Sequence, residues 1–339
     1  MDARRSWDVK LEGAVLGKVA FAMRRSARFG LLSFVAAIAP LAACGSSAGA
    51  PVDDAPFPDA GVESATGPSP EAGVEADAGV MPNADASTDA SFPSRCTVTD
   101  SSVYCSHEVT PLEAGGVTRD VYWQTPSTPA PAGGYPVVLL YQGSLGGPSL
   151  TWDTLTPNVP FGGFHQGRLQ AMLLDHGFTV IAPAAAAGVA WQTNSGVPYD
   201  LTTDKQVIDA LLVAVENGDF GPADMSRLYA TGISSGGYMT SRMAVSYAGK
   251  FRALAIQSAS YATCLGAVCN VPNKLPADHP PTLFLHGALD TTVPLFTAER
   301  YYDELVADAV ATKKIVDPSA GHAWLAVSPA EITDWFTKH

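Results

Sequence analysis

The stretch RLYATGISSGGYMT, residues 227–240, decides the fold of this chain. Residues 228–230 have the composition of a buried strand, and a helical pattern begins at Gly236. Between them lies GISSG at 232–236, a G-x-S-x-G pattern centred on Ser234. A serine on a tight strand-to-helix turn needs glycine neighbours, because larger side chains would collide with the turn. Ser234 is therefore the candidate nucleophile.

Strand and helix patterns alternate on both sides of this stretch. The apolar run at 136–141 is typical of a strand covered on both faces, and 203–217 has the apolar spacing of a helix. Further strands are expected at 178–183, 227–232, 253–257, 281–286 and 312–316, and further helices at 166–176, 236–247, 296–309 and from 328. Segments 103–107 and 118–124 are expected to pair as an antiparallel hairpin. The pattern predicts one α/β domain over 95–339, with a mostly parallel twisted sheet and helices on both faces.

A nucleophilic serine needs a base, and the base needs an acid that orients it. In this arrangement the acid and then the base follow the serine in the chain, each after a later strand. Asp290 ends the turn after the expected strand 281–286, and His322 lies on the loop after 312–316. Asp317 also precedes His322, but its place at the end of the last strand makes it the weaker candidate. The predicted triad is Ser234, Asp290 and His322.

From Arg95 to its end the chain resembles the α/β-hydrolase superfamily. Two stretches, 232–240 and the HGALDTTVP segment at 286–294, are similar to secreted polyhydroxybutyrate-depolymerase-like and feruloyl-esterase-like serine esterases. The resemblance implies hydrolysis of a small or polymeric carboxylic ester through an acyl-enzyme, without a cofactor. It also implies Ser234 as nucleophile, His322 as general base and then acid, and Asp290 as the orienting carboxylate.

The loop after the strand 136–141 departs from the pattern of these families. They carry His-Gly where this chain has Gln142-Gly143-Ser144. The second oxyanion donor is a backbone N–H, so a glycine-rich loop still provides one. We expect the oxyanion hole to use the N–H of Ser235 together with that of Gln142, Gly143 or Ser144, with the choice among these three open.

Three aromatic residues are candidates for lining the substrate groove. Trp324 lies two positions after the proposed base, Tyr238 lies just after the serine turn, and Trp191 lies in a loop rich in alanine and glycine. Ordinary core packing is an equally good interpretation of Tyr238 and Trp191.

The N-terminal part has the pattern of an exported lipoprotein. Met23 begins a basic segment and an apolar stretch that ends at Cys44, and LAAC at 41–44 resembles the bacterial lipobox. We expect residues 1–43 to be a signal peptide with its true start at Met23, and Cys44 to be lipidated. Residues 44–94 contain nine acids and no base and are expected to form a disordered linker. The protein would then be anchored to a membrane of the cell envelope, with the outer membrane favoured, or be secreted.

The remaining four cysteines form two locally spaced pairs. In an exported protein the expected disulfides are Cys96–Cys105 and Cys264–Cys269, with four free thiols as the alternative. Their spacing matches no metal site. The chain has 33 acidic against 20 basic residues, a formal net charge of −13, which argues against nucleic acid as a partner.

Two other functions share the same residues. A serine peptidase of the prolyl-oligopeptidase type has the same triad and fold, and a substrate panel distinguishes it from an esterase. A binding protein on a hydrolase scaffold needs no triad, and covalent labelling of the serine distinguishes it from an enzyme.

Overall fold

The computed structural model describes residues 92–153 and 155–339. Its strands are β1 (Cys96–Val98), β2 (Val103–Cys105), β3 (Glu108–Ala114), β4 (Val117–Gln124), β5 (Tyr135–Tyr141), β6 (Thr179–Pro183), β7 (Ala223–Ile233), β8 (Ala253–Gln257), β9 (Thr282–Gly287) and β10 (Thr312–Asp317). Its helices are α1 (Pro148–Trp152), α2 (Gly163–Asp175), α3 (Thr203–Glu216), α4 (Ser235–Ser246), α5 (Leu295–Ala307) and α6 (Ser328–Lys338), with short 3-10 turns at Pro160–Gly162, Gln192–Asn194 and Tyr199–Leu201. The predicted signal segment, Cys44 and nearly all of the linker lie outside the described residues.

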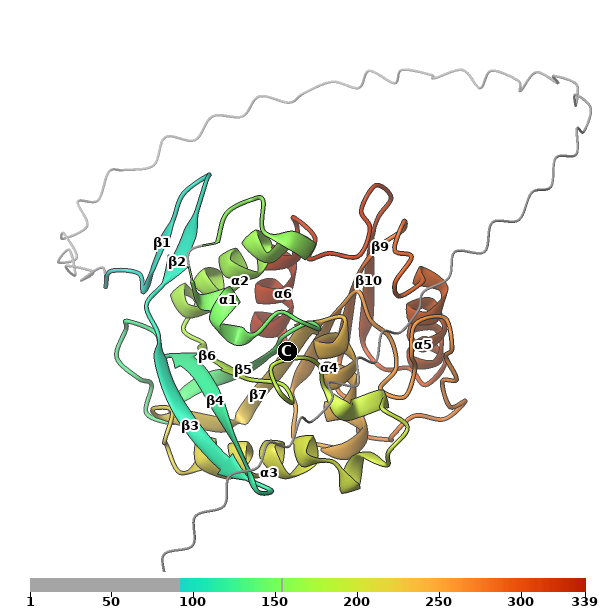
Figure 1. Ribbon diagram of the computed structural model, residues 1–339, viewed down its shortest axis with the longest axis horizontal. Helices are drawn as coiled ribbons and strands as arrows, with labels where there is room; N and C mark the ends of the chain where they lie inside the picture. Colours follow the sequence, from blue (N-terminus) through green and yellow to red (C-terminus); the bar gives the residue numbers. More distant parts are fainter. Residues whose placement is uncertain (1–91, 154) are drawn as a thin grey trace, which may run out of the picture. The chain divides into compact units, whose positions relative to one another are not determined.

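Eight strands form one sheet in the order β10-β9-β8-β7-β5-β6-β4-β3 (Figure 1). Strands β5 to β10 pair in parallel, whereas β3 and β4 are antiparallel at one edge. The predicted mostly parallel α/β sheet is confirmed. The carboxyl ends of its parallel strands meet at one edge, which is where ligand sites form in open sheets of this class.

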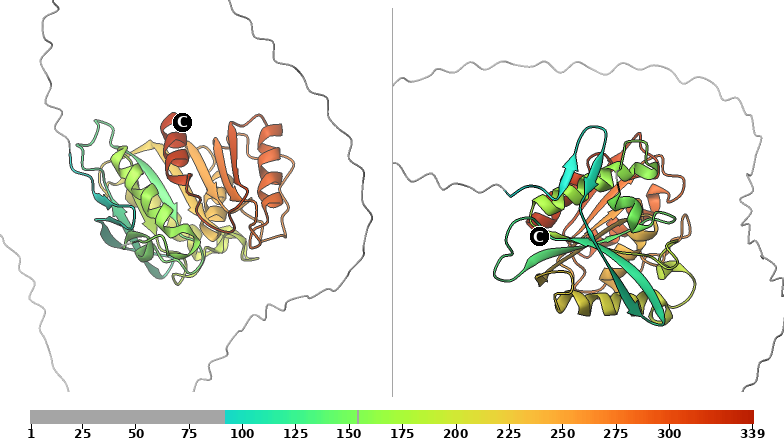
Figure 2. Two further views of the ribbon diagram at one scale, coloured as in Figure 1. Left: turned by 90° about the horizontal axis from the view of Figure 1, so that it is seen from above. Right: turned by 60° about the vertical axis from the view of Figure 1, so that its left-hand side comes forward.

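The expected hairpin of 103–107 with 118–124 is wrong. β2 instead pairs with β1, with Cys96 opposite Cys105, and β4 pairs with β3 (Figure 2, right). A two-residue turn of Gly115 and Gly116, both at positive φ, joins β3 to β4. Gly-Gly is a preferred sequence for such a hairpin turn, and this signal indicates the correct pairing.

Helices cover both faces of the sheet. On one face α2 packs beside α6 (Figure 1), and Leu169, Leu173 and Phe336 meet the strand residues Val138 and Leu140. On the other face α3 and α4 pack against the alternate residues of β5, while α5 covers the β8–β9 end. β5 is buried at every position because both of its faces are covered, as its apolar sequence predicts.

Both expected disulfides are present, Cys96–Cys105 and Cys264–Cys269. Disulfides persist in oxidising compartments, so this domain is that of a protein located outside the cytoplasm. None of the helices in the described part of the chain is both long and apolar enough to span a bilayer.

Candidate active site

Ser234 lies at the turn between β7 and α4, at the carboxyl edge of the sheet. Its backbone has φ 56° and ψ −120°, a conformation that L-residues rarely adopt. Its N–H donates to the Gln257 carbonyl at 3.1 Å, and its own carbonyl accepts from the Tyr238 N–H at 3.0 Å. The half-buried serine is thus held at a strained turn by β8 on one side and by the first turn of α4 on the other.

The glycines of the turn allow two backbones to approach closely. A Cβ on Gly236 would lie 2.1 Å from the Tyr141 carbonyl oxygen, and one on Gly232 would lie 2.6 Å from the same oxygen. β5 and α4 therefore meet at a distance that only glycine permits. This packing explains why the motif has glycine on both sides of the serine.

Asp290 and His322 meet on the loops that follow β9 and β10. Asp290 Oδ2 lies 2.7 Å from His322 Nδ1, and the carboxylate is buried while the imidazole is 11% exposed. The carboxylate fixes Nδ1 as the protonated nitrogen, because ionised oxygen only accepts. The other nitrogen, Nε2, is then free of its proton and able to act as a base.

The surroundings of Asp290 hold its carboxylate in the ionised form. Its Oδ1 accepts from the N–H groups of Thr292 and Val293 at 2.9 and 2.8 Å. His286 Nε2 lies 2.8 Å from the Val293 carbonyl and 3.4 Å from Asp290 Oδ2. Burial by itself would raise the pKa of Asp290, but the bonds from His286, His322 and Val293 outweigh it and hold that pKa well below its usual range.

Asp317, the alternative acid, has a different set of partners. Its Oδ1 accepts from the N–H and hydroxyl of Ser319 and from the N–H of Ala320, and these bonds lower its pKa. It thus stabilises the turn that leads to His322. In the structure the hydrogen-bond partner of His322 is Asp290.

Gln257, which sequence reasoning missed, joins the serine turn to the histidine loop. Its backbone carbonyl accepts the Ser234 N–H, and its buried Nε2 donates to the carbonyls of Ala323 at 2.8 Å and Leu285 at 3.0 Å. Its Oε1 accepts from the Ser328 hydroxyl at 2.6 Å. One side chain therefore links β8, β9 and the part of the loop that follows His322.

The loop after β5 lies against the serine. A Cβ on Gly143 would lie 3.8 Å from the Cβ of Ser234. The side chain of Gln142 points elsewhere, because its amide bonds the Ala185 N–H and the Gly188 carbonyl. Gln142 can therefore contribute only its backbone N–H to an oxyanion site. The N–H groups of Gln142, Gly143 and Ser144 stay the candidate donors.

The three aromatic residues expected to line a groove are buried. Trp324, Trp191 and Tyr238 are only 2–3% exposed. Trp324 Nε1 donates to Gln166, Trp191 Nε1 donates to the Gln142 carbonyl, and burial raises the pKa of Tyr238 to about 12. The structure corrects this expectation, because these side chains pack beneath the loops and present almost no surface.

Phe161 occupies the position that those residues were expected to take. Its ring is exposed and lies edge-on to His322, with 6.0 Å between ring centroids. Its φ is 57°, and its carbonyl accepts from the Trp324 N–H at 2.9 Å. The adjacent Gly162, at positive φ, is the only sequence signal for this turn.

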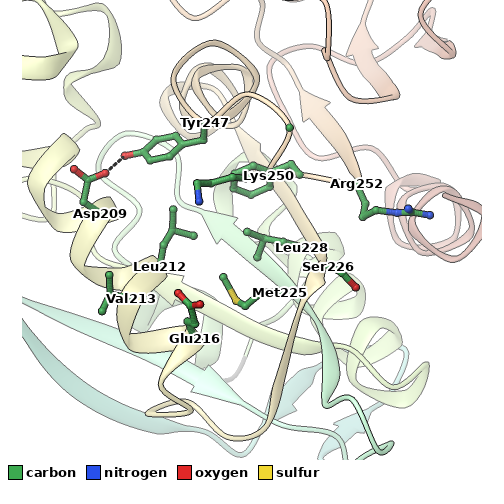
Figure 3. A pocket seen from close by; sticks show the side chains of 12 residues that line it. Asp209, Leu212, Val213, Glu216, Met225, Ser226, Leu228, Tyr247, Lys250 and Arg252 are labelled. Atoms are coloured by element: carbon green, nitrogen blue, oxygen red, sulfur yellow. Dashed lines mark hydrogen bonds between the residues drawn. The ribbon is translucent and has the colours of Figure 1, made fainter.

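A cavity of about 650 Å³ lies away from these residues (Figure 3). It is lined by side chains of α3, the start of β7 and the segment 247–252, including Val213, Leu228 and Lys250. Leu228 is six positions before Ser234 on β7, about 20 Å away at 3.3 Å per residue. In the described residues no group of three or more His, Cys, Asp or Glu is placed to hold a metal ion.

Comparison with known proteins relates the chain to one curated enzyme. It is 50% identical over 251 residues to a poly(3-hydroxyoctanoate) depolymerase of Pseudomonas fluorescens, a match that covers 72% of this chain and 89% of that protein. No family model matches the chain.

Solved structures share the fold at low identity. A thermostable esterase matches with a TM-score of 0.50 and 17% identity over 68% of this chain and 62% of the esterase. A puromycin-hydrolyzing peptidase of Mycobacterium tuberculosis matches with a TM-score of 0.50 and 18% identity over 68% of this chain and 39% of the peptidase. With the depolymerase, these matches confirm the α/β-hydrolase fold. The chain belongs to the family of the Pseudomonas depolymerase and is a serine carboxylic ester hydrolase.

Proposed function

We propose that this protein depolymerises aliphatic polyesters of 3-hydroxyalkanoic acids, with Ser234, His322 and Asp290 as its catalytic triad. The observation that carries the proposal is the Asp290–His322 bond at the same sheet edge as the strained Ser234 turn, in a chain half identical to a polyester depolymerase. The loops that carry Asp290 and His322 lie at the protein surface, where an ester bond within a polymer chain can reach them.

In the proposed mechanism His322 Nε2 takes the proton of Ser234 as its oxygen attacks the ester carbonyl carbon. The N–H of Ser235 and one N–H from Gln142, Gly143 or Ser144 stabilise the oxyanion. The imidazolium then protonates the leaving hydroxyl end of the polymer, and the C–O bond breaks. Water, deprotonated by His322, attacks the acyl-enzyme and releases the carboxylic acid end while Ser234 regains its proton. Asp290 remains ionised throughout.

The alternative function is cleavage of peptide amides, favoured only by the shared fold of the puromycin-hydrolyzing peptidase. The test compares rates on poly(3-hydroxyoctanoate) particles, short p-nitrophenyl esters and proline-containing peptide amides. We expect ester and polymer hydrolysis, abolished in Ser234→Ala and reduced by several orders of magnitude in His322→Ala. Faster cleavage of an amide than of every ester would contradict the proposal.

We further propose that Cys44 carries a lipid that holds the enzyme in the cell envelope, favouring the outer membrane. The lipobox-like LAAC at 41–44 and the extracytoplasmic disulfides support this anchor. A Cys44→Ser variant should remain an unprocessed precursor, seen as a larger mass. Normal release of a soluble mature form from this variant would mean that ordinary signal cleavage operates.

A further inference from the structure

The most exposed apolar side chains of the described residues gather at one edge of the sheet. Six large apolar side chains are between 61% and 79% exposed, whereas the other exposed ones are at most 56% exposed. We call these six the apolar rim: Leu145, Phe161, Leu201, Leu265, Val268 and Leu289. All six lie on segments that follow the carboxyl ends of the parallel strands β5, β6, β8 and β9.

The same segments carry almost no charge. The segments that carry the six residues, 142–162, 184–201, 258–273 and 287–298, contain no Lys or Arg, and their acids are Asp153, Asp200 and Asp290, in a chain of which 16% is charged. In the segment 287–298 the single charged side chain is Asp290, which is buried against His322. An exposed apolar surface that is poor in charge and lies at the mouth of a site marks a place of contact with another apolar surface.

The Cys264–Cys269 disulfide shapes one part of the rim. Between the cysteines, Leu265 and Val268 exchange both backbone hydrogen bonds, at 2.8 and 3.0 Å, around a tight turn. Cys264 is buried, and its carbonyl accepts from Asn194 Nδ2 at 2.6 Å. The two apolar side chains are therefore held outward on a fixed base, which lowers the entropy cost of binding through them.

The rim adjoins the candidate triad. Phe161 contacts the His322 ring, and the Leu289 N–H donates to the Ala320 carbonyl at 2.9 Å, between the loops of Asp290 and His322. A Cβ on Gly266 would lie 3.4 Å from the Thr292 carbonyl, so the disulfide turn rests against the Asp290 loop. A surface that settles on the rim therefore lies beside the loops that carry Asp290 and His322.

We propose that the apolar rim adsorbs the enzyme to the surface of solid aliphatic polyester, an inference that rests on the proposed function. Such a surface is apolar and uncharged, and the rim matches it with six exposed apolar side chains on segments that are poor in charge. A membrane with anionic headgroups would favour Lys or Arg, which these segments lack. Two copies of the domain, with 21 acids and 13 bases each in residues 95–339, would repel each other.

The test uses the purified full chain and a double variant of the disulfide turn, Leu265→Asp with Val268→Asp. The matched control is Val213→Asp with Val306→Asp, two exposed valines near the ends of α3 and α5 away from the site; Val213 is labelled in Figure 3. Each protein is mixed with poly(3-hydroxyoctanoate) particles and with phosphatidylcholine vesicles. Bound protein, polymer hydrolysis and hydrolysis of soluble p-nitrophenyl butyrate are then measured.

We expect the rim variant to adsorb to the polymer at least about tenfold more weakly than the wild type, because two apolar contacts become charges. Its ratio of polymer to soluble-ester rates should fall with adsorption, while the control variant keeps the wild-type ratio. Equal polymer adsorption by the rim variant would overturn the inference, as would a loss confined to vesicle binding or to self-association. A wild type that hydrolyses the soluble ester but neither binds nor cleaves the polymer would overturn the proposed function as well.

Discussion

At the scale of single residues, Gln257 is the side chain that most tightly couples the candidate nucleophile to the candidate base. Its side chain bonds the Ala323 carbonyl and the Ser328 hydroxyl, both after His322, and its backbone carbonyl accepts the Ser234 N–H. Gln257→Leu leaves the buried Ser328 hydroxyl without its acceptor, at a cost of about 1–3 kcal/mol, whereas the Ala323 carbonyl keeps the bond from the Ser258 hydroxyl. We therefore expect lower stability and, at temperatures where the variant is folded, a fall in kcat with little change in KM for a soluble ester.

Ser328→Ala is the matched control, because it removes one bond of Gln257 but keeps the donors to Ala323 and Leu285. It should lose stability but retain most of kcat. If Gln257→Leu lost stability and kept the wild-type kcat, Gln257 would be a core residue without influence on the site.

The sequence predicts the residues of the site whose pattern is local. Ser234 stands in a recognisable turn, and Asp290 and His322 each follow a strand, so the order of motifs along the chain is sufficient to propose them as a triad. Gln257 and Phe161 have no local motif, because their contacts with the histidine loop join residues far apart in the chain, 66 positions for Gln257 and Ala323 and 161 for Phe161 and His322. The burial of Trp191 and Trp324 depends on which loop covers them, and this is set by packing that no short pattern encodes.

At the scale of elements, the end of β9 packs directly on the histidine loop. A Cβ on Gly287 would lie 2.3 Å from the carbonyl oxygens of both Ala320 and Gly321. Since backbone atoms make these contacts, Gly287→Ala must shift the loop, at a cost of about 1–3 kcal/mol for overpacking. We expect reduced unfolding free energy and a marked fall in ester hydrolysis.

Gly133→Ala provides the comparison, because only one atom, 3.8 Å away, would meet its new Cβ. Denaturant unfolding of the two variants should separate them, with Gly133→Ala within about 0.5 kcal/mol of the wild type. Equal stability and activity of both variants would show that the β9–loop contact does not position His322.

The parallel strands and long helices were predictable because each has a strong apolar pattern of its own. The pairing at the antiparallel edge was not predictable in the same way. Three strands, β1, β2 and β3, precede β4, and either β2 or β3 could pair with it. The disulfide partner of Cys96 and the Gly115-Gly116 turn decide between these pairings. A turn of two glycines is the stronger signal, because it joins β4 to the segment directly before it, β3.

At the scale of the whole molecule, one buried histidine makes the fold sensitive to mild acid. His279 lies between the Pro280 carbonyl at 2.9 Å and the Tyr301 hydroxyl at 2.6 Å, and burial lowers its pKa. The unfolded chain, with an ordinary histidine pKa of about 6.5, takes up the proton first as pH falls. The stability that neutral His279 contributes is therefore fully present above about pH 6.5. It is lost as the pH falls toward the lower pKa that His279 has in the folded protein.

We expect the unfolding free energy of the wild type to decrease between pH 7.5 and 5.5. His279→Gln should be less stable at pH 7.5 but show a smaller decrease, by up to about 1.4 kcal/mol for each unit of pKa shift. His176→Gln, an exposed position, is the control. An unchanged pH dependence in His279→Gln would assign the acid sensitivity to other groups.

The central claim is that Ser234 is the nucleophile of an ester hydrolase built at the carboxyl edge of this sheet. Its most direct test is mass spectrometry of the protein after reaction with an octyl fluorophosphonate, with ester hydrolysis followed in parallel. The account predicts one adduct per chain, located on the peptide containing Ser234, and activity that disappears in proportion to labelling. An adduct on another residue such as Ser144, or full activity in a chain labelled at Ser234, would contradict it.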